Sequence, residues 1–295
     1  MRGIVLAGGR GTRLLPATGV ISKQLLPIYD TPMIFHPVAL LMAAGIREIM
    51  LISTPESLPA FRRLLGDGSQ FGISMTYAEQ AQPRGIAEAL IIADAFTRGE
   101  PATLVLGDNL FLGGATAKLM RNAFGRVSGA TVFATPVDNP QAFGIVSLDE
   151  NGIASAIEEK PREPQSNYAV TGLYIYDGLA ADIAAAVQPS ARGEIEITDV
   201  NRAYLKRGNL FAEILPPGET WFDTGTPDSL LEAAQRVRRL EQESGRKIGC
   251  LEDIAFAARW IDADGVRAAA QRWSGSTYAR YLEALAAHAP VLEQS

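Results

Sequence analysis

The chain is poor in the residues that build disulfides and transition-metal sites. It contains one cysteine, Cys250, among 295 residues, and only two histidines, His36 and His288. A single cysteine excludes a disulfide within the chain and is typical of a reducing compartment. One cysteine and two histidines also fall short of the usual ligand set of a zinc site. We therefore expect a cytoplasmic protein without zinc.

Basic clusters and long apolar runs are missing as well. Lys and Arg number 27 against 33 Asp and Glu, which gives a formal net charge of −6. Sequence-independent binding of nucleic acid needs a field of Lys and Arg, so we expect no nucleic-acid partner. No apolar stretch approaches the roughly 20 residues of a membrane span, and the apolar start is too short for a signal peptide. We expect no membrane partner.

What the sequence does contain is an alternation of short apolar runs with amphipathic segments between residue 2 and about residue 135. This βαβ pattern predicts a Rossmann-like α/β fold, with a mostly parallel twisted sheet flanked by helices. Ligands of such sheets bind beyond the carboxyl ends of the strands. The expected strands are Ile4–Ala7, Ile49–Ser53, Ile73–Ala78, Thr103–Leu106 and Thr131–Thr135, and the expected helices are Pro32–Ala44, Leu58–Leu65, Ile86–Phe96 and Thr116–Phe124.

The rest of the chain changes character twice. Residues 136–220 are mixed, with further strands expected at Gly144–Leu148, Ile153–Glu159 and Ala169–Tyr176. From Thr226 onward the pattern is almost wholly helical. Because no linker or repeat separates these parts, we interpret residues 1–295 as one domain. It comprises an α/β core over 1–225 and a helical C-terminal extension over 226–295.

A glycine-rich loop follows the first predicted strand and reads Gly8-Gly9-Arg10-Gly11-Thr12-Arg13. Glycines at this place let the backbone turn tightly and present N–H groups to a phosphate. The loop is not a dinucleotide fingerprint, because Leu14 stands where the third glycine would be, and the chain has no Gly-Lys-Ser/Thr. Arg13 and Lys23 are nearby cations suited to phosphate. The plain alternative is a glycine turn beside solvated cations.

Two carboxylates are candidate metal ligands. Asp108 ends a predicted buried strand, and Asp223 lies far away in Trp221-Phe-Asp-Thr-Gly. A pair of carboxylates plus phosphate oxygens is a common way to hold Mg²⁺. Taken singly, Asp108 also fits a helix cap and Asp223 a turn.

Several motifs together resemble the sugar nucleotidyltransferases, and among them the glucose-1-phosphate thymidylyltransferases. The resemblance covers nearly the whole chain in order and implies the nucleotide-diphospho-sugar transferase type of fold. The motifs that carry it include Leu6-Ala-Gly-Gly-Arg-Gly-Thr-Arg-Leu, Ile21-Ser-Lys-Gln-Leu-Leu-Pro, Leu106-Gly-Asp-Asn, Glu158-Glu-Lys-Pro, Arg192-Gly-Glu-Ile and Phe222-Asp-Thr-Gly-Thr.

The resemblance implies an enzyme that joins dTTP and glucose 1-phosphate, with Mg²⁺, into dTDP-glucose and pyrophosphate. It further implies a homotetramer that serves nucleotide-sugar biosynthesis, in a dTDP-rhamnose or other deoxysugar pathway. The implied catalytic residues are Arg13, Lys23, Asp108 and Asp223, of which Asp108 and Asp223 hold the metal. The implied nucleotide-binding residues are Leu6, Ala7, Gly8, Gly9, Gly11, Thr12, Arg13, Gln24, Gln80 and Gly85. The implied sugar-phosphate-binding residues are Gly144, Glu159, Lys160, Val170 and Arg192.

Some positions depart from the usual spelling of that family. Phe143 replaces a common Tyr, and Glu88 replaces a common Gln, so the base and sugar preferences stay open. Gly114 and Ala257 replace a frequent His and a frequent Arg at the family's regulatory site, which predicts weak or absent feedback inhibition. The alternatives are the same reaction with UTP or another sugar 1-phosphate, or a non-catalytic sugar-nucleotide sensor.

Overall fold

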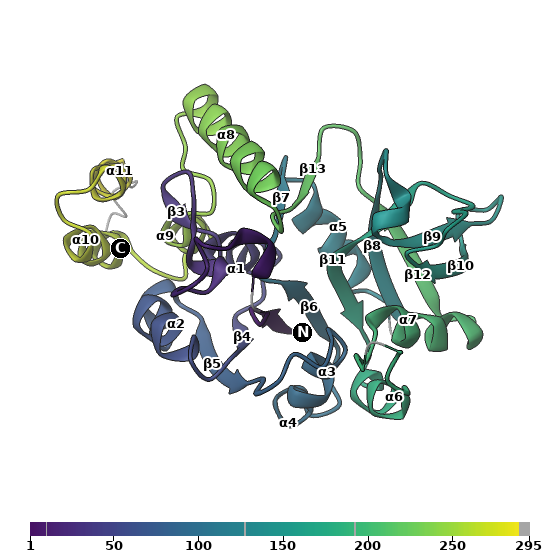
Figure 1. The fold of residues 1–295 in the computed structure, drawn as a ribbon. Coiled ribbons are helices and arrows are strands. Elements are labelled where there is room, and N and C mark those ends of the chain that lie inside the picture. The colour runs from purple at the N-terminus through teal and green to yellow at the C-terminus, as the bar shows by residue number, and fades with distance from the viewer. Residues whose placement is uncertain (10, 127, 192, 289–295) are drawn as a thin grey trace.

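The centre of the computed structural model, which describes residues 1–9, 11–126, 128–191 and 193–288, is a nine-stranded sheet (Figure 1). Its main path runs β10-β9-β11-β6-β1-β4-β5, and β8 lies beside β11 with β12 beside β8. The strands are β1 (Arg2–Leu6), β4 (Glu48–Ser53), β5 (Ser74–Glu79), β6 (Ala102–Leu106), β8 (Ala130–Pro136), β9 (Gly144–Leu148), β10 (Ala154–Glu159), β11 (Tyr168–Tyr176) and β12 (Leu210–Ile214).

Most strands of this sheet point the same way. β1 pairs in parallel with both β4 and β6, and β4 pairs in parallel with β5. β11 is antiparallel to β6, β8 and β9, and β10 is antiparallel to β9. Among the strands described, only β10 and β11 therefore run against the others. This confirms the predicted mostly parallel sheet, and its carboxyl edge gathers the ends of β1, β4 and β6.

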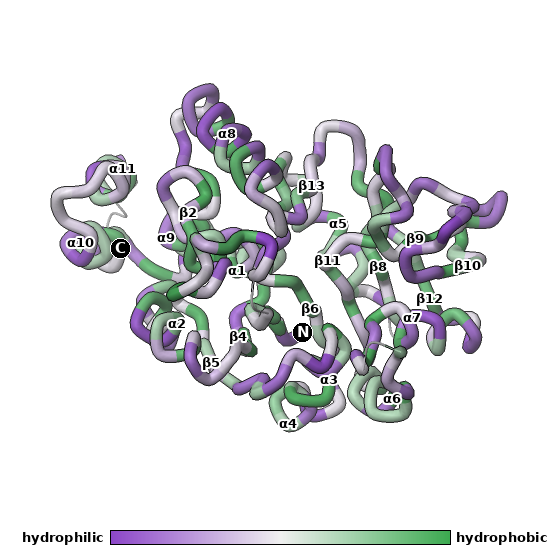
Figure 2. The backbone as a smooth tube through the Cα atoms, in the orientation of Figure 1, coloured by the Kyte–Doolittle hydropathy of each residue, from purple (hydrophilic) through white to green (hydrophobic). Residues whose placement is uncertain are grey.

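Helices cover both faces of the sheet, as predicted, because alternate residues of each strand face opposite sides. In β1, Val5 points into the core beneath α1 (Phe35–Ala43), α2 (Leu58–Leu65), α5 (Thr116–Ala123) and α9 (Leu251–Ala257). Ile4 points into the opposite core beneath α3 (Glu88–Ile92), α6 (Ala180–Ala186) and α7 (Ile197–Lys206). In Figure 2 the central strands carry largely hydrophobic colour, whereas hydrophilic residues gather on α8 (Pro227–Ser244) and on the outer loops.

The C-terminal segment is helical, as predicted. Helix α8 begins at a capping box between Thr226 and Ser229 and ends at Gly245, whose φ is 69°. The next helix, α9, packs into the sheet core through Leu251 and Ala255. Helices α10 (Ala263–Arg272) and α11 (Thr277–Ala287) pack on each other at the end of the molecule remote from β10 (Figure 1). None of the described helices is long and apolar enough to cross a membrane.

Element boundaries differ from the sequence prediction in several places. The helix expected from Pro32 begins at Phe35, because β3 (Thr31–Pro32) pairs with β2 (Pro27–Ile28). The helix expected over Ile86–Phe96 is two short helices, α3 and α4 (Asp94–Thr97), that meet at Ala93. The sequence also missed β12, α6, α7 and a separate ribbon in which β7 (Asn109–Leu112) pairs with β13 (Thr220–Asp223).

Candidate active site

The glycine loop is anchored where β1 ends. Ala7 N–H donates to the carbonyl of Ile52 at 2.7 Å, and Ser53 Oγ donates to the Ala7 carbonyl at 2.8 Å. The Leu6 carbonyl accepts from Gly107 N–H at 2.8 Å. Leu6 and Ala7 are both buried. These two predicted nucleotide-binding residues therefore anchor the start of the loop to the sheet.

The loop itself depends on glycine at two positions. A Cβ on Gly8 would lie 2.6 Å from Oε1 of Gln80, so a larger residue at this position would displace that side chain. Gly11 has a φ of 57° in the left-handed region, and it leads into a short 3₁₀ helix, η1 (Thr12–Leu14), which carries Arg13. Gln24 is 1% exposed and donates from Nε2 to the Gly8 carbonyl at 3.3 Å. Gln24 thus stabilises the loop through a hydrogen bond from a buried side chain.

Lys23 and Asp108 form an ion pair in which the ammonium group donates to Oδ2 of the carboxylate. The other carboxylate oxygen, Oδ1, accepts from Nδ2 of Asn109 at 3.1 Å. The two charged side chains are 13% and 14% exposed, respectively. Little solvent therefore screens this pair, and its charges act strongly on neighbouring groups.

Asp223 lies beside this pair because β13 aligns it with Asn109. Thr224 fastens the junction, since its N–H and its Oγ1 donate to the Asp108 carbonyl at 3.1 and 2.7 Å. Burial raises the pKa of Asp223, the charge of Asp108 raises it further, and Lys23 and Arg13 oppose the shift. These couplings place the four predicted catalytic residues within one electrostatic site.

The two carboxylates suit a divalent cation whose coordination shell would be completed by oxygens of the substrate. Asp108 and Asp223 come together through the β7–β13 ribbon. Burial raises the pKa of Asp223 most, and the charge of Asp108 adds to the shift with a repulsion that a cation would relieve. Nowhere do the described residues gather three or more Asp, Glu, His or Cys side chains in a metal-binding group. Such a pair fits Mg²⁺, which keeps waters and takes further oxygens from phosphates.

A cavity of about 190 Å³ opens next to the carboxylates and contains most of the predicted acceptor residues. Oε2 of Glu159 accepts from Thr198 Oγ1 at 2.7 Å, and Nζ of Lys160 lies 3.7 Å from Oε1 of the same carboxylate. Lys160 has a φ of 45°, which is unusual outside glycine. Arg192 lies outside the described residues. The lining includes Arg13, Asp108, Phe143, Gly144, Glu159, Lys160, Val170, Thr198, Trp221 and Asp223.

A second cavity, of about 500 Å³, is lined by Gly9 of the glycine loop and by Gln80. Gln80 donates from Nε2 to the Gly85 carbonyl at 3.2 Å and to Oε2 of Glu88 at 2.8 Å. Gly85 has a φ of 106°, and a Cβ there would collide with the carbonyl of Ile195. This cavity is lined by Gly9, Thr18, Gly19, Val20, Ile21, Ser22, Leu25, Thr54, Glu56, Ser57, Ala60, Gln80, Ala81 and Pro83.

The segment that follows Arg192 is hydrogen-bonded to the loop around Gly85. Ile195 N–H donates to the Arg84 carbonyl at 2.7 Å, and Ala87 N–H donates to the Ile195 carbonyl at 3.3 Å. These bonds join a segment on the acceptor side to the loop that holds Gln80. The acceptor side of the site and the loop around Gly85 are therefore joined by backbone hydrogen bonds.

Sequence reasoning missed several residues that support the site. Trp221 Nε1 donates to Oδ1 of Asn109 at 2.5 Å, and Gly172 N–H donates to the same oxygen at 3.0 Å. The Trp221 ring also packs edge-on against Phe143, with the centroids 5.3 Å apart. Trp221 lies two residues before Asp223, and Asn109 directly follows Asp108. Their adjacency in sequence was the available signal.

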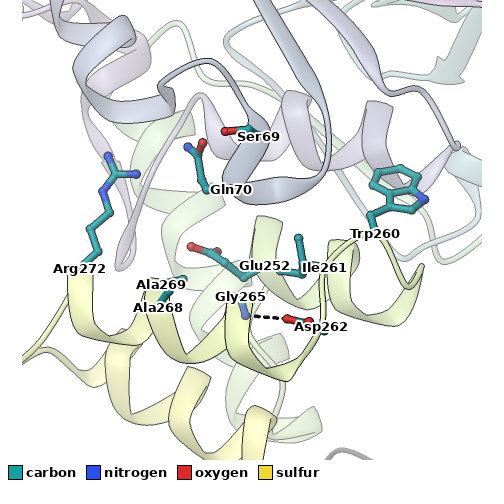
Figure 3. A pocket seen from close by; sticks show the side chains of 10 residues that line it. All are labelled: Ser69, Gln70, Glu252, Trp260, Ile261, Asp262, Gly265, Ala268, Ala269 and Arg272. Carbon is teal, nitrogen blue, oxygen red and sulfur yellow. Dashed lines mark hydrogen bonds between the residues drawn. The ribbon is translucent and has the colours of Figure 1, made fainter. Parts of the chain in front are cut away.

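A different cavity, of about 440 Å³, lies where the C-terminal helices meet the α/β core (Figure 3). None of the predicted site residues lines it. Its buried carboxylate, Glu252, accepts at Oε2 from the hydroxyl of Tyr278 at 2.5 Å. The drawn bond from Gly265 N–H to Asp262 caps helix α10. These contacts serve packing between helices, so we place the active site at the glycine loop.

The fold and this constellation of cationic and acidic groups define a nucleotidyltransferase. Residues 2–239 match the model of the nucleotidyl transferase family, and the chain belongs to that family. Its similarity to curated relatives spans nearly the full length of both chains.

The relatives include glucose-1-phosphate thymidylyltransferases from several bacteria. The one from Xanthomonas campestris pv. campestris (strain B100) is 50% identical over 285 residues, covering 97% of each chain. Those from Neisseria meningitidis serogroup A and Mycobacterium tuberculosis (strain H37Rv) are each 49% identical over 282 residues, covering 96% of this chain and 98% of theirs.

Solved structures of nucleotidyltransferases have a similar fold. A Bacillus anthracis structure assigned as a glucose-1-phosphate thymidylyltransferase, in complex with sucrose, superposes with a TM-score of 0.75 and 41% identity. The match covers 81% of this chain and 95% of that one. A UDP-glucose pyrophosphorylase with UDP-glucose bound has a TM-score of 0.71 at 24% identity, over 81% and 98% of the two chains. At that identity the likeness concerns the fold.

Proposed function

We propose that this chain transfers a thymidylyl group from dTTP to glucose 1-phosphate, giving dTDP-glucose and pyrophosphate. The observation that carries the proposal is the electrostatic coupling of Arg13, Lys23, Asp108 and Asp223, three of which line the smaller cavity. The near-full-length similarity to glucose-1-phosphate thymidylyltransferases supports the same reaction.

In this reaction an oxygen of the sugar 1-phosphate attacks the α-phosphorus of the triphosphate in line. A new O–Pα bond forms, the bond from Pα to the bridging oxygen breaks, and pyrophosphate leaves with that electron pair. The attacking group is already an anion, so no side chain has to remove a proton. Catalysis then consists of aligning two anions that repel each other and offsetting the charge on the leaving group.

Each predicted residue has a place in this scheme. On the triphosphate side, the backbone of Gly8, Gly9 and Gly11 and the Thr12 turn cradle the phosphates, and Arg13 balances the charge of pyrophosphate. Lys23 lies nearest the α-phosphate once it exchanges Asp108 for substrate. When bound by Asp108 and Asp223, Mg²⁺ would supply positive charge to the phosphate oxygens.

The smaller cavity is assigned to the sugar phosphate. Lys160, together with Arg192, neutralises the attacking phosphate, and Glu159 accepts hydrogen bonds from sugar hydroxyls. Gly144 and Val170 offer backbone groups at the cavity wall. Because Thr198 already holds one oxygen of Glu159, that carboxylate has a fixed direction before substrate arrives.

The larger cavity is assigned to the base and sugar of the nucleotide, with Gln80, which donates to the Gly85 carbonyl, at the pyrimidine edge. Thymine and uracil share that edge and differ by one methyl group, worth roughly 10–200-fold in selectivity. UTP is therefore the second candidate donor. We also infer a cytoplasmic homotetramer that supplies a deoxysugar pathway such as that of dTDP-rhamnose.

Pyrophosphate release tests the proposal. The full chain is assayed with Mg²⁺ and glucose 1-phosphate against dTTP, UTP, CTP, ATP and GTP in turn. The proposal expects the highest kcat/KM with dTTP and the next highest with UTP. If dTTP gave no pyrophosphate release while dTDP-sugars still bound tightly, the chain would instead be interpreted as a sugar-nucleotide sensor. Release with dTTP only for another sugar 1-phosphate would keep the reaction and change the acceptor.

A further inference from the structure

The strand that brings Asp223 to the site has little apolar burial of its own. All four residues of β13 are only half-buried, and the turn before it, at Pro217 and Gly218, is exposed. A two-stranded ribbon by itself is marginally stable in water. The position of Asp223 therefore depends on contacts that fasten the two ends of β13.

The end of β13 next to the site is fastened by Thr224 and Trp221. Thr224 donates twice to the Asp108 carbonyl, and Trp221 donates to Oδ1 of Asn109. The opposite end, where Thr220 pairs with Leu112, emerges from the exposed turn and needs a separate anchor.

Glu219, directly before β13, binds the start of helix α5. Its Oε2 accepts from Ala115 N–H at 2.8 Å, and its Oε1 accepts from the hydroxyl of Thr116 at 2.6 Å. The N-cap residue of α5 is Ala115, whose own side chain cannot accept a hydrogen bond. A carboxylate 104 positions further along the chain thus takes that role, and its negative charge suits the unpaired N–H groups of a helix N-terminus.

The surroundings of Glu219 are rigid on the helix side. Thr116 is 1% exposed, and Ala117 and Met120 of α5 are part of the sheet core. A Cβ on Gly113 would lie 2.5 Å from Oε2 of Glu219 and 2.8 Å from the Gly218 carbonyl, so the end of β7 packs directly against this contact. Glu219 therefore joins the start of β13 to an element with a fixed position.

We propose that Glu219 is a positioning residue for Asp223, because its hydrogen bonds to α5 hold β13 in the register that sets Asp223 beside Asp108. Side chains two residues apart lie on the same face of a strand, so Trp221 and Asp223 share one face of β13. A slip of one residue would turn that face away from the site. The proposal rests on the proposed function, in which Asp223 helps to hold the cation.

Glu219→Ala tests this role through two independent readouts. Amide hydrogen exchange in β13 should become faster than in the wild-type chain, because the strand loses its anchor at Thr220. A displacement of about 1 Å at a catalytic group can cost on the order of 10²-fold in rate, so we expect kcat to fall roughly 10-fold. The Mg²⁺ concentration for half-maximal pyrophosphate release should rise, whereas KM for glucose 1-phosphate at saturating Mg²⁺ and dTTP should change little.

Two further variants separate positioning from a general loss of stability. Glu219→Gln keeps an oxygen for Ala115 N–H and offers an NH₂ group to the Thr116 hydroxyl, so it should recover most of kcat. Asp262→Ala removes another carboxylate that caps a helix, since Asp262 accepts from Gly265 N–H at 2.9 Å at the start of α10. It should lower the Tm but leave kcat and the Mg²⁺ requirement at their wild-type values.

Faster exchange in β13 together with wild-type kcat and Mg²⁺ requirement would make Glu219 a helix cap only and overturn the proposal. Unchanged exchange in β13 of Glu219→Ala would overturn it as well, as would an equal fall of kcat in Asp262→Ala. Failure of the proposed function would appear separately, as absent dTTP turnover by the wild-type chain. The exchange comparison alone would then decide whether Glu219 holds β13.

Discussion

The ammonium group of Lys23 donates a hydrogen bond to the carboxylate of Asp108, although the two residues are 85 positions apart in sequence. Lys23 belongs to the short 3₁₀ helix η2 (Lys23–Leu25), and Asp108 lies two residues beyond the end of β6. The pair offsets the negative charge that Asp108 places beside Asp223. The pair thus holds Lys23 next to the carboxylates, where the phosphates it is proposed to bind would lie.

Lys23→Ala should lower kcat far more than it raises KM for either substrate. The proposed contact of Lys23 with the α-phosphate strengthens as charge develops during transfer, and removing one such group costs roughly 10²- to 10³-fold in kcat. Steady-state kinetics with dTTP and glucose 1-phosphate measure the effect. Lys118→Ala, on the exposed side of α5, is the matched control. An unaltered kcat would remove Lys23 from the reaction.

Asp223→Asn should stabilise the metal-free protein near neutral pH. The pKa of Asp223 is raised, first by burial and then by Asp108, above its ordinary value of 3.8. When a carboxyl has a higher pKa in the folded than in the unfolded chain, the folded protein loses stability as the pH rises from the lower pKa to the higher one. The loss persists at higher pH. Thermal unfolding in a chelator should therefore give a higher Tm for the variant at neutral pH.

The same variants should differ little in acid. Below the ordinary pKa the carboxyl is protonated in both the folded and the unfolded chain, so the advantage of Asn disappears. Asp138→Asn, at an exposed loop position, should leave the Tm unchanged across the range. Equal Tm values for wild type and Asp223→Asn at neutral pH would contradict the burial effect.

Asp223→Asn should also raise the Mg²⁺ concentration needed for half-maximal activity. An amide oxygen lacks the charge with which a carboxylate holds a hard cation. A Mg²⁺ titration of pyrophosphate release measures this requirement. Superimposable titrations for the variant and the wild type would exclude Asp223 as a metal ligand.

Trp221→Phe should loosen the ribbon that aligns the two carboxylates. The change deletes the hydrogen bond from Nε1 to Asn109 while keeping an aromatic ring against Phe143. We expect a loss of about 1 kcal/mol in the free energy of unfolding, measured with urea, because a typical hydrogen bond contributes that much. Trp273→Phe, on the distant helical segment, is the control for a general loss of indole.

Lys160→Ala should raise KM for glucose 1-phosphate and leave KM for dTTP nearly unchanged. Its ammonium group lies in the smaller cavity, and a charge-assisted hydrogen bond of about 1.5–3 kcal/mol corresponds to roughly 10- to 100-fold in affinity. Lys160→Arg keeps the charge and should recover part of the affinity. A larger effect on dTTP than on glucose 1-phosphate would reverse the assignment of the two cavities.

The elements of the fold that depend on the local pattern of apolar residues could be predicted from the sequence. The apolar runs of β1, β4 and β6, and the place of Asp108 just beyond the end of β6, follow directly from the sequence. His36 is 6% exposed, and burial lowers its pKa to about 4, so it is neutral at physiological pH.

The remainder depends on contacts between distant segments. Strands β7 and β13 have four residues each, too few to show periodicity, and their pairing spans more than a hundred positions. The bond from Gln80 to Glu88 likewise follows from how β5 and α3 approach each other. The sequence marked Glu88 as unusual, but its partner became visible only in the folded chain.

The hydrogen bonds between Ile195 and the Arg84–Ala87 loop have a consequence for the order of events in a catalytic cycle. Gln80 lines the larger cavity and donates to the Gly85 carbonyl, so a nucleotide bound there would also order this junction and lower the entropy cost of setting its other side around the acceptor. Linkage makes the effect reciprocal, so glucose 1-phosphate and dTTP should raise each other's affinity by one common factor. A triphosphate that binds first would then prepare the enzyme for its sugar.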